Sequence, residues 1–165
     1  MRLLKQGLFS ILFLAILVQV IALLFPSHII VSRAITIHAP IDSVRPYLQN
    51  IKGWQLWINS MDDASVHIQS STKAQIGNRS VQIEIVNADS VVSVWRSAKS
   101  NLLISTMQMI PASNGDATVV QWQYEQFLHW YPWERFGSLM SDKIIGGMLE
   151  QNLNHLQALL EKKNN

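Results

Sequence analysis

The feature that most constrains this chain is an uninterrupted apolar run near its N-terminus, from Gly7 to Phe25. The run contains no charged residue, and its only polar members are Ser10 and Gln19. A helix of this length rises about 28 Å, which is close to the roughly 30 Å hydrocarbon core of a bilayer. The run therefore predicts a transmembrane helix that ends at Pro26.

A cleaved signal peptide is the competing interpretation of the same run. A signal peptide needs a shorter apolar core and small residues at its cleavage site, whereas this run ends in Leu-Leu-Phe-Pro. Arg2 and Lys5 precede the run, so the positive-inside rule predicts a cytoplasmic N-terminus. We therefore expect a cytoplasmic tip and anchor over 1–26. A domain over 27–165 then lies on the extracytoplasmic side of the inner (cell) membrane.

Charge and cysteine content exclude several function classes. Two of the 13 basic residues precede the apolar run, which leaves 11 basic and 11 acidic residues in the remainder. A neutral domain lacks the basic surface of a nucleic-acid binder. The chain has no cysteine, which excludes disulfides, thiolate metal sites and cysteine nucleophiles. The five histidines are not spaced as metal ligands, so we expect no metal and no cofactor.

The rest of the chain alternates between strand and helix patterns. Short helices are predicted at Pro40–Leu48 and Gly53–Asn59, and His129–Phe136 is an aromatic connector. Six segments rich in β-branched residues and bounded by turn residues read as strands: His28–His38, Ser65–Gln69, Arg79–Asn87, Val91–Ala98, Leu102–Ile110 and Ala117–Phe127. The later strands follow one another with short connections, which predicts an antiparallel meander.

A long helix is predicted at the C-terminal end, over Gly137–Lys163. It has one apolar stripe at helical spacing, formed by Ile145, Leu149, Leu153, Leu156 and Leu160. Arg79–Asn87 alternates apolar and polar residues, with Val81, Ile83 and Ile85 on the apolar side. A sheet with one apolar face and a single long helix to cover it predicts a two-layer α+β domain.

Several short stretches, taken in order, resemble one superfamily. They are Pro26-Ser27, Arg33–Ile37 with Ala39-Pro40, Trp54-Gln55-Leu56-Trp57, Trp122, and Gly147–Leu156. This series resembles the SRPBCC superfamily of START-like, birch-allergen-like helix-grip proteins, specifically its bacterial polyketide cyclase/dehydrase-like branch with an N-terminal anchor. The resemblance implies a curved antiparallel sheet wrapped around the C-terminal helix. It also implies a cavity between them for lipids, sterols, polyketides or quinones.

Candidate site residues follow from the strand and helix patterns combined with this resemblance. Thr118, Val120, Trp122 and Tyr124 share one strand face, on the side expected to meet the helix. We expect a ligand-binding cavity lined by Trp122, Tyr124, Val120, Met107, Met109, Trp95, Met148 and Leu149, with Arg96 and Glu125 as its polar groups. In the alternative interpretation, the aromatic and methionine side chains simply fill the core.

No catalytic motif is found in the sequence. It has no phosphate-binding glycine loop, nucleophile elbow or dinucleotide fingerprint, so no catalytic residue is predicted. The first hypothesis is a membrane-anchored, non-catalytic module that binds a hydrophobic small molecule or lipid. One alternative is a cyclase- or dehydratase-type enzyme that uses the same cavity. Another is an envelope protein-interaction domain without an open cavity. Trp130, Tyr131 and Trp133 are candidates for a cavity lid, a membrane-interface belt or core packing.

Overall fold

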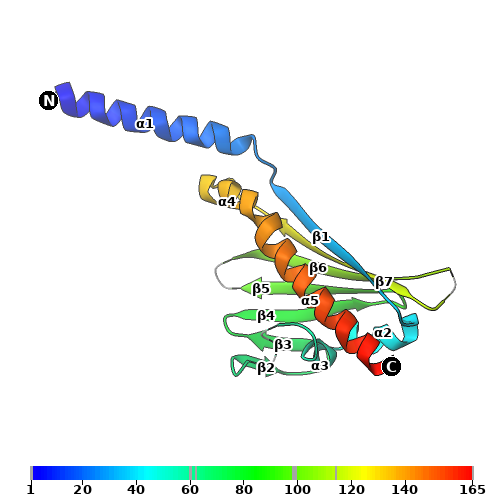
Figure 1. Ribbon diagram of the computed structural model, residues 1–165. Helices are drawn as coiled ribbons and strands as arrows, with labels where there is room; N and C mark the ends of the chain where they lie inside the picture. The colour runs from blue at the N-terminus through cyan, green and yellow to red at the C-terminus, as the bar shows by residue number, and fades with distance from the viewer. Residues whose placement is uncertain (1, 60, 62, 98–99, 114, 165) are drawn as a thin grey trace.

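The computed structural model describes residues 2–59, 61, 63–97, 100–113 and 115–164. In this part of the chain the strands form a seven-stranded antiparallel sheet in the order β1-β7-β6-β5-β4-β3-β2. Helix α5 (Ser141–Asn164) lies across one face of this sheet, as Figure 1 shows. The strands are β1 (His28–Ile37), β2 (Val66–Ile68), β3 (Lys73–Ile76), β4 (Arg79–Val86), β5 (Ser90–Ser97), β6 (Ser100–Pro111) and β7 (Thr118–Phe127).

Helix α1 (Arg2–Leu23) extends away from the rest of the molecule (Figure 1). Its segment Leu4–Leu23 is long and apolar enough to cross a bilayer, although a signal sequence has the same length and composition. Most of its large apolar side chains are exposed, but Ala22 in the last turn is fully buried. There α1 contacts the short helix α4 (Pro132–Gly137).

The predicted two-layer α+β architecture is confirmed. Four leucines of the predicted stripe on α5 are at most 2% exposed: Leu149, Leu153, Leu156 and Leu160. The inward face of β7 is also as predicted, since Thr118, Val120, Trp122 and Tyr124 are all buried. The hydrophobic core therefore lies between the concave side of the sheet and α5.

Two short helices close one end of the space between sheet and helix. Helix α2 (Ile41–Leu48) buries Val44 and Leu48, and α3 (Ile51–Trp54) begins at Asn50, whose side chain accepts a hydrogen bond from the Lys52 amide. This side-chain cap satisfies one of the free amides at the start of the helix. Trp54 and Trp57 are almost fully buried, so they fix this segment onto the sheet.

The structure corrects several predicted elements. Strand β3 was missed, because Lys-Ala-Gln-Ile is short and half polar. The long helix begins at Ser141 rather than Gly137, and α4 together with the 3₁₀ turn η1 (Ser138–Met140) occupies the preceding segment. Ile85 was predicted on the buried face but is 49% exposed, because the register between β4 and β5 shifts between Ile83 and Ile85. Met1, Ala98 and Asn165, which end predicted segments, lie outside the described residues.

Candidate functional site

A cluster of aromatic rings lies between the sheet and the short helices. Trp122 on β7 packs edge-on against Trp57, with ring centroids 5.2 Å apart, and lies 5.5 Å from Tyr124. Trp95 on β5 stacks with Trp54 at 6.4 Å and meets Tyr124 edge-on at the same distance. These contacts connect β5 and β7 to α3 through a continuous set of rings.

The indole N–H groups of this cluster all have partners within the protein. Trp54 donates to the Leu48 carbonyl at 2.7 Å and Trp57 to the Tyr47 carbonyl at 3.0 Å. Trp122 donates to the Ser105 hydroxyl at 2.8 Å, and Trp95 donates to the Ser93 hydroxyl at 3.3 Å. Because these polar atoms are satisfied, the tryptophans present their apolar ring faces to the neighbouring space.

That neighbouring space is a cavity of about 500 Å³ between the sheet and the first half of α5. Its volume lies within the range of about 300–1,000 Å³ that is typical of small-molecule sites. It is lined by Ile58, Asn59, Met61, Ile76, Arg79, Trp95, Arg96, Ser97, Leu103, Trp122, Tyr124, Gln126, Ile144, Ile145, Met148 and Asn152. The cavity therefore combines an aromatic and aliphatic wall with a few polar groups.

The polar groups at the cavity differ in their surroundings. Asn152 is 1% exposed, and its side-chain oxygen accepts a hydrogen bond from the Asn59 backbone amide at 2.8 Å. Burial raises the pKa of Tyr124, which the neighbouring Ser105 hydroxyl and the charge of Arg79 partly offset. Arg96 forms an exposed ion pair with Glu84 at 3.3 Å. Among the described residues, the Arg79 side chain forms no hydrogen bond or ion pair, although its charge acts on Tyr124. Arg79 is thus a cation available at the cavity wall.

The structure brings half of the predicted site residues together. Trp95, Arg96, Trp122, Tyr124 and Met148 all line the cavity. Four other predicted lining residues lie deeper in the core and are at most 2% exposed: Met107, Met109, Val120 and Leu149. They share the inward faces of the sheet and helix, but the neighbouring side chains cover them completely.

Glu125 lies on the other face of the sheet. It follows Tyr124 in β7, and successive residues of a strand point to opposite faces. Its carboxylate is 3.4 Å from His28 Nε2 and accepts a hydrogen bond from the side-chain amide of Gln123 at 2.7 Å. The prediction that Glu125 is a polar group of the cavity is therefore corrected.

Several lining residues were missed by sequence reasoning. Asn152 was detectable, because it is a polar residue beside Leu149 and Leu153 on an otherwise apolar helix stripe. Asn59, Met61 and Arg79 come from loops and a strand end that only the fold brings together. No local sequence pattern marks those three residues.

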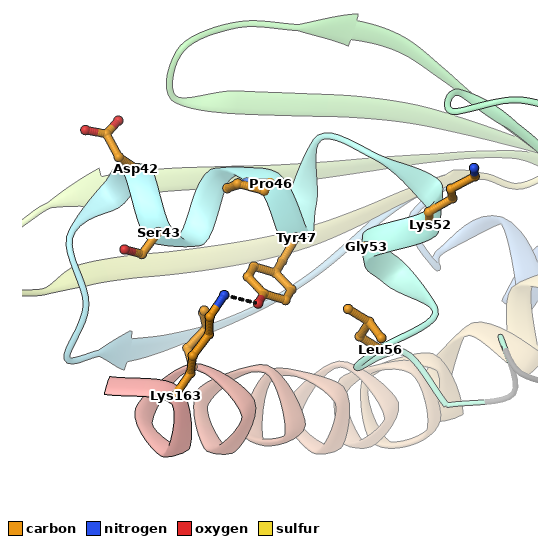
Figure 2. Close-up of a pocket in the computed structure, with 9 residues that line it drawn as sticks. Asp42, Ser43, Pro46, Tyr47, Lys52, Gly53, Leu56 and Lys163 are labelled. Carbon is orange, nitrogen blue, oxygen red and sulfur yellow. Dashed lines mark hydrogen bonds between the residues drawn. The ribbon is translucent and has the colours of Figure 1, made fainter. Parts of the chain in front are cut away.

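A second hollow, of about 510 Å³, lies at the opposite end of α5 (Figure 2). Figure 2 shows α2 and α3 facing the end of α5, where Lys163 Nζ donates to the Tyr47 hydroxyl at 3.4 Å. Asp42, Lys52 and Leu56 at its rim are exposed to solvent. This hollow is an open surface groove with charged edges, so the aromatic cavity is the stronger candidate site.

Comparisons with solved structures agree with the overall fold. The chain is similar to the Zhui aromatase/cyclase from a Streptomyces species, with 10% identity and a TM-score of 0.65 over 84% of this chain and 96% of that chain. It is also similar to a START superfamily protein from Mycobacterium smegmatis, with 11% identity and a TM-score of 0.60 over 81% and 97% of the two chains. A norcoclaurine synthase from Thalictrum gives 9% identity and a TM-score of 0.64 over 84% and 97%.

These similarities define the class of protein as a START-like helix-grip fold. A sequence model of the family described as polyketide cyclase/dehydrase and lipid transport matches residues 28–161, so the chain belongs to that family. No curated protein sequence matches the chain significantly. The predicted SRPBCC resemblance is therefore confirmed for the domain that follows α1.

Proposed function

We propose that this protein is a membrane-anchored, non-catalytic binding module for an amphipathic, lipid-like small molecule. The observation that supports the proposal most directly is the cavity of about 500 Å³ beside Trp95, Trp122 and Tyr124. Apolar rings with internally satisfied N–H groups favour an apolar ligand body, because burial of apolar surface drives its binding. Asn152 and Arg79 line the same cavity and could bind a polar head group of the ligand.

The charge at the cavity wall favours an anionic head group. The side-chain oxygen of Asn152 accepts a hydrogen bond from the Asn59 backbone N–H, and the Asn152 side-chain NH₂ group can donate to a ligand. Arg79 offers a guanidinium, which recognises carboxylates and phosphates through paired hydrogen bonds. A fatty acid or a similar amphiphile satisfies both parts of the cavity, with its chain over the tryptophans and its head group near Arg79.

The enzyme alternative is less well supported by the same residues. Among the described residues, the ionisable side chains that line the cavity are Arg79, Arg96 and Tyr124. Arginine is not deprotonated in proteins, and burial raises the pKa of Tyr124 away from neutrality. The described lining therefore offers no carboxyl or imidazole group for the acid–base step that a cyclase or dehydratase requires. The interaction-domain alternative needs a closed cavity, which the open volume argues against.

The binding proposal can be tested with the full-length protein in detergent. Parinaric acid, a fluorescent fatty acid, should bind and receive energy from the cavity tryptophans, and native mass spectrometry should detect a co-purified lipid. Met148→Trp, which adds bulk at the cavity, should weaken binding by roughly tenfold or more, because filling the volume removes the ligand's space. Ile85→Trp adds the same ring at an exposed position of β4 outside the cavity and should leave binding unchanged. Equal affinity in both variants would reject this site.

The membrane location is part of the proposal and has its own test. Uncharged Gly7–Phe25 follows Arg2 and Lys5, so we propose that α1 spans the inner membrane once with its N-terminus in the cytoplasm. An alkaline phosphatase fused after Lys163 should then be active, and the mature protein should keep its first residues. A mature N-terminus near Ser27 would instead identify α1 as a signal peptide.

A further inference from the structure

The segment between the sheet and the main part of α5 exposes many large apolar side chains. We call this surface the α4 face: Trp130, Trp133, Leu139, Met140, Ile144 and Met148, which are 41% to 69% exposed. A helical segment in water normally turns such side chains inward. Exposed apolar side chains gathered in one stretch of chain mark an interaction surface.

The two charged residues of α4, Glu134 and Arg135, contact the protein, whereas Asp142 and Lys143 at the start of α5 are exposed. The Glu134 carboxylate accepts a hydrogen bond from the His129 backbone amide at 2.7 Å and lies 3.2 Å from His129 Nδ1. The Arg135 guanidinium donates to the Phe25 carbonyl and, at 3.1 Å, to the His129 carbonyl. The usual arrangement of a water-exposed helix is thus reversed around α4, with charges inside and aromatic and aliphatic groups outside. Such a surface suits contact with an apolar medium.

Direct contacts hold the α4 face beside the end of α1. Gln19 Nε2 donates to the Trp130 carbonyl at 3.0 Å, and the rings of Phe25 and Phe136 meet edge-on at 5.3 Å. Figure 1 shows α4 next to the domain end of α1. Gln19 is one turn before the end of α1 at Leu23, which is about 6 Å along the helix axis. If α1 spans the bilayer, Trp130 lies at the depth of the interfacial layer, where tryptophan is favoured.

The α4 face also borders the cavity. Ile144 and Met148 belong to both, since each is exposed and each lines the cavity wall. We propose that the α4 face is inserted into the interfacial layer of the membrane that α1 spans, and that the cavity exchanges its ligand with this leaflet rather than with water. This inference rests on the proposed membrane anchor and the proposed amphipathic ligand.

The absence of cysteine in the chain allows a depth measurement on the full-length protein. Single-cysteine variants Trp133→Cys and Leu139→Cys would be labelled with nitrobenzoxadiazole and reconstituted in vesicles of phosphatidylethanolamine and phosphatidylglycerol. Lipids with a nitroxide near the head group should quench both labels. Leu56→Cys, which is as exposed but lies near α3 at the other end of α5, should remain unquenched. Equal, weak quenching at all three positions would overturn the docking proposal. The measurement needs no ligand, so the binding proposal would survive that result.

The route of the ligand is tested by exchange kinetics. Parinaric acid would be delivered from donor vesicles to the reconstituted protein, and its arrival followed by energy transfer from tryptophan. Leu139 is 62% exposed and does not line the cavity, so Leu139→Glu should slow arrival by roughly tenfold by weakening apolar contact with the membrane. Leu56→Glu is the matched control and should leave the rate unchanged. A rate unaffected by Leu139→Glu, with binding intact, would overturn the membrane route.

Discussion

The two halves of α5 meet the same sheet but differ in how they are covered. In the C-terminal half, Leu153, Leu156 and Leu160 are at most 2% exposed. The N-terminal half buries Leu149 completely but leaves Ile144 and Met148 66% and 41% exposed. Buried residues of α2 and α3 belong to the same core as the three leucines of the C-terminal half, and the aromatic cavity lies beside Ile144 and Met148. The C-terminal half of α5 therefore serves the core, whereas the N-terminal half contributes Leu149 to the core and also borders the candidate site.

The largest expected effect is a loss of stability on substitution of buried leucines in the C-terminal half of α5. Leu153→Ala or Leu156→Ala should lower the free energy of unfolding by about 2–5 kcal/mol, because each deletes fully buried methyl groups and leaves a void. Ile144→Ala should change it by less than about 0.5 kcal/mol, as expected for an exposed side chain. Urea unfolding in detergent, followed by circular dichroism, would measure both. Similar losses at Leu153 and Ile144 would contradict the comparison.

A substitution at Gly53 tests how closely α2 packs against α3. A β-carbon there would lie 2.7 Å from the Pro46 carbonyl oxygen and 2.9 Å from the Tyr47 α-carbon, and both are backbone atoms that cannot easily move. Gly53→Ala should therefore destabilise the domain by about 1–3 kcal/mol through overpacking of α2 against α3. The loss should appear in the midpoint of urea unfolding. A neutral result would mean that α2 and α3 are packed more loosely than the structure indicates.

Gly53 also illustrates what the sequence could and could not predict. The long helix, its leucine stripe and the main strands were predictable, because periods of 3.6 and 2 repeat over enough residues to be unambiguous. The close approach of α2 to α3 at Gly53 depends on tertiary packing, which no local pattern records. The same holds for Ile85, where a shift in register, invisible in the alternation, moves the side chain to solvent.

The candidate site was predictable only in part for the same reason. Trp122 and Tyr124 were found because alternation along β7 places them on the inward face. Alternation cannot distinguish a side chain that borders a cavity from one that is covered, as Met107 and Met109 are. Helix α4 was missed although Pro132 stands at its first position, where proline is favoured. The proline favours a helix at this position, but the many aromatic residues of His129–Phe136 favoured the prediction of a connector.

Tyr124, which lies on β7 beside the cavity, offers a test of how well its hydroxyl is shielded from water. Its pKa is raised by burial, so above pH 10 the unfolded chain can ionise this phenol while the folded domain keeps it neutral. Stability should therefore fall as the pH rises above about 10, by up to about 1.4 kcal/mol per pH unit for this group. Tyr124→Phe should reduce this fall. Unfolding curves of both proteins at increasing pH would measure it, and identical slopes would mean that the Tyr124 hydroxyl is well solvated in the folded state.

The two neighbouring glycines of α5 give the smallest and most local contrast. Both are unfavourable in a helix interior, and alanine is better by about 1 kcal/mol at such positions. A β-carbon at Gly147 meets nothing within 4 Å, so Gly147→Ala should stabilise the domain by about that amount. A β-carbon at Gly146 would lie 2.2 Å from Arg33 Nη2, the atom that pairs with Asp142 at 3.1 Å.

Gly146→Ala must displace the Arg33 side chain and break this partly exposed ion pair. The loss of the pair, which is worth up to about 1 kcal/mol, should offset the gain in helix propensity and leave the free energy of unfolding nearly unchanged. Thermal unfolding of the two single variants, at low and high salt, would measure the difference between them. Added salt should narrow that difference, because it weakens the Arg33–Asp142 ion pair, which Gly147→Ala keeps and Gly146→Ala loses. Equal stabilisation by both alanines would mean that Arg33 does not lie across Gly146. A loss of stability in Gly147→Ala would mean that another group covers this side of α5.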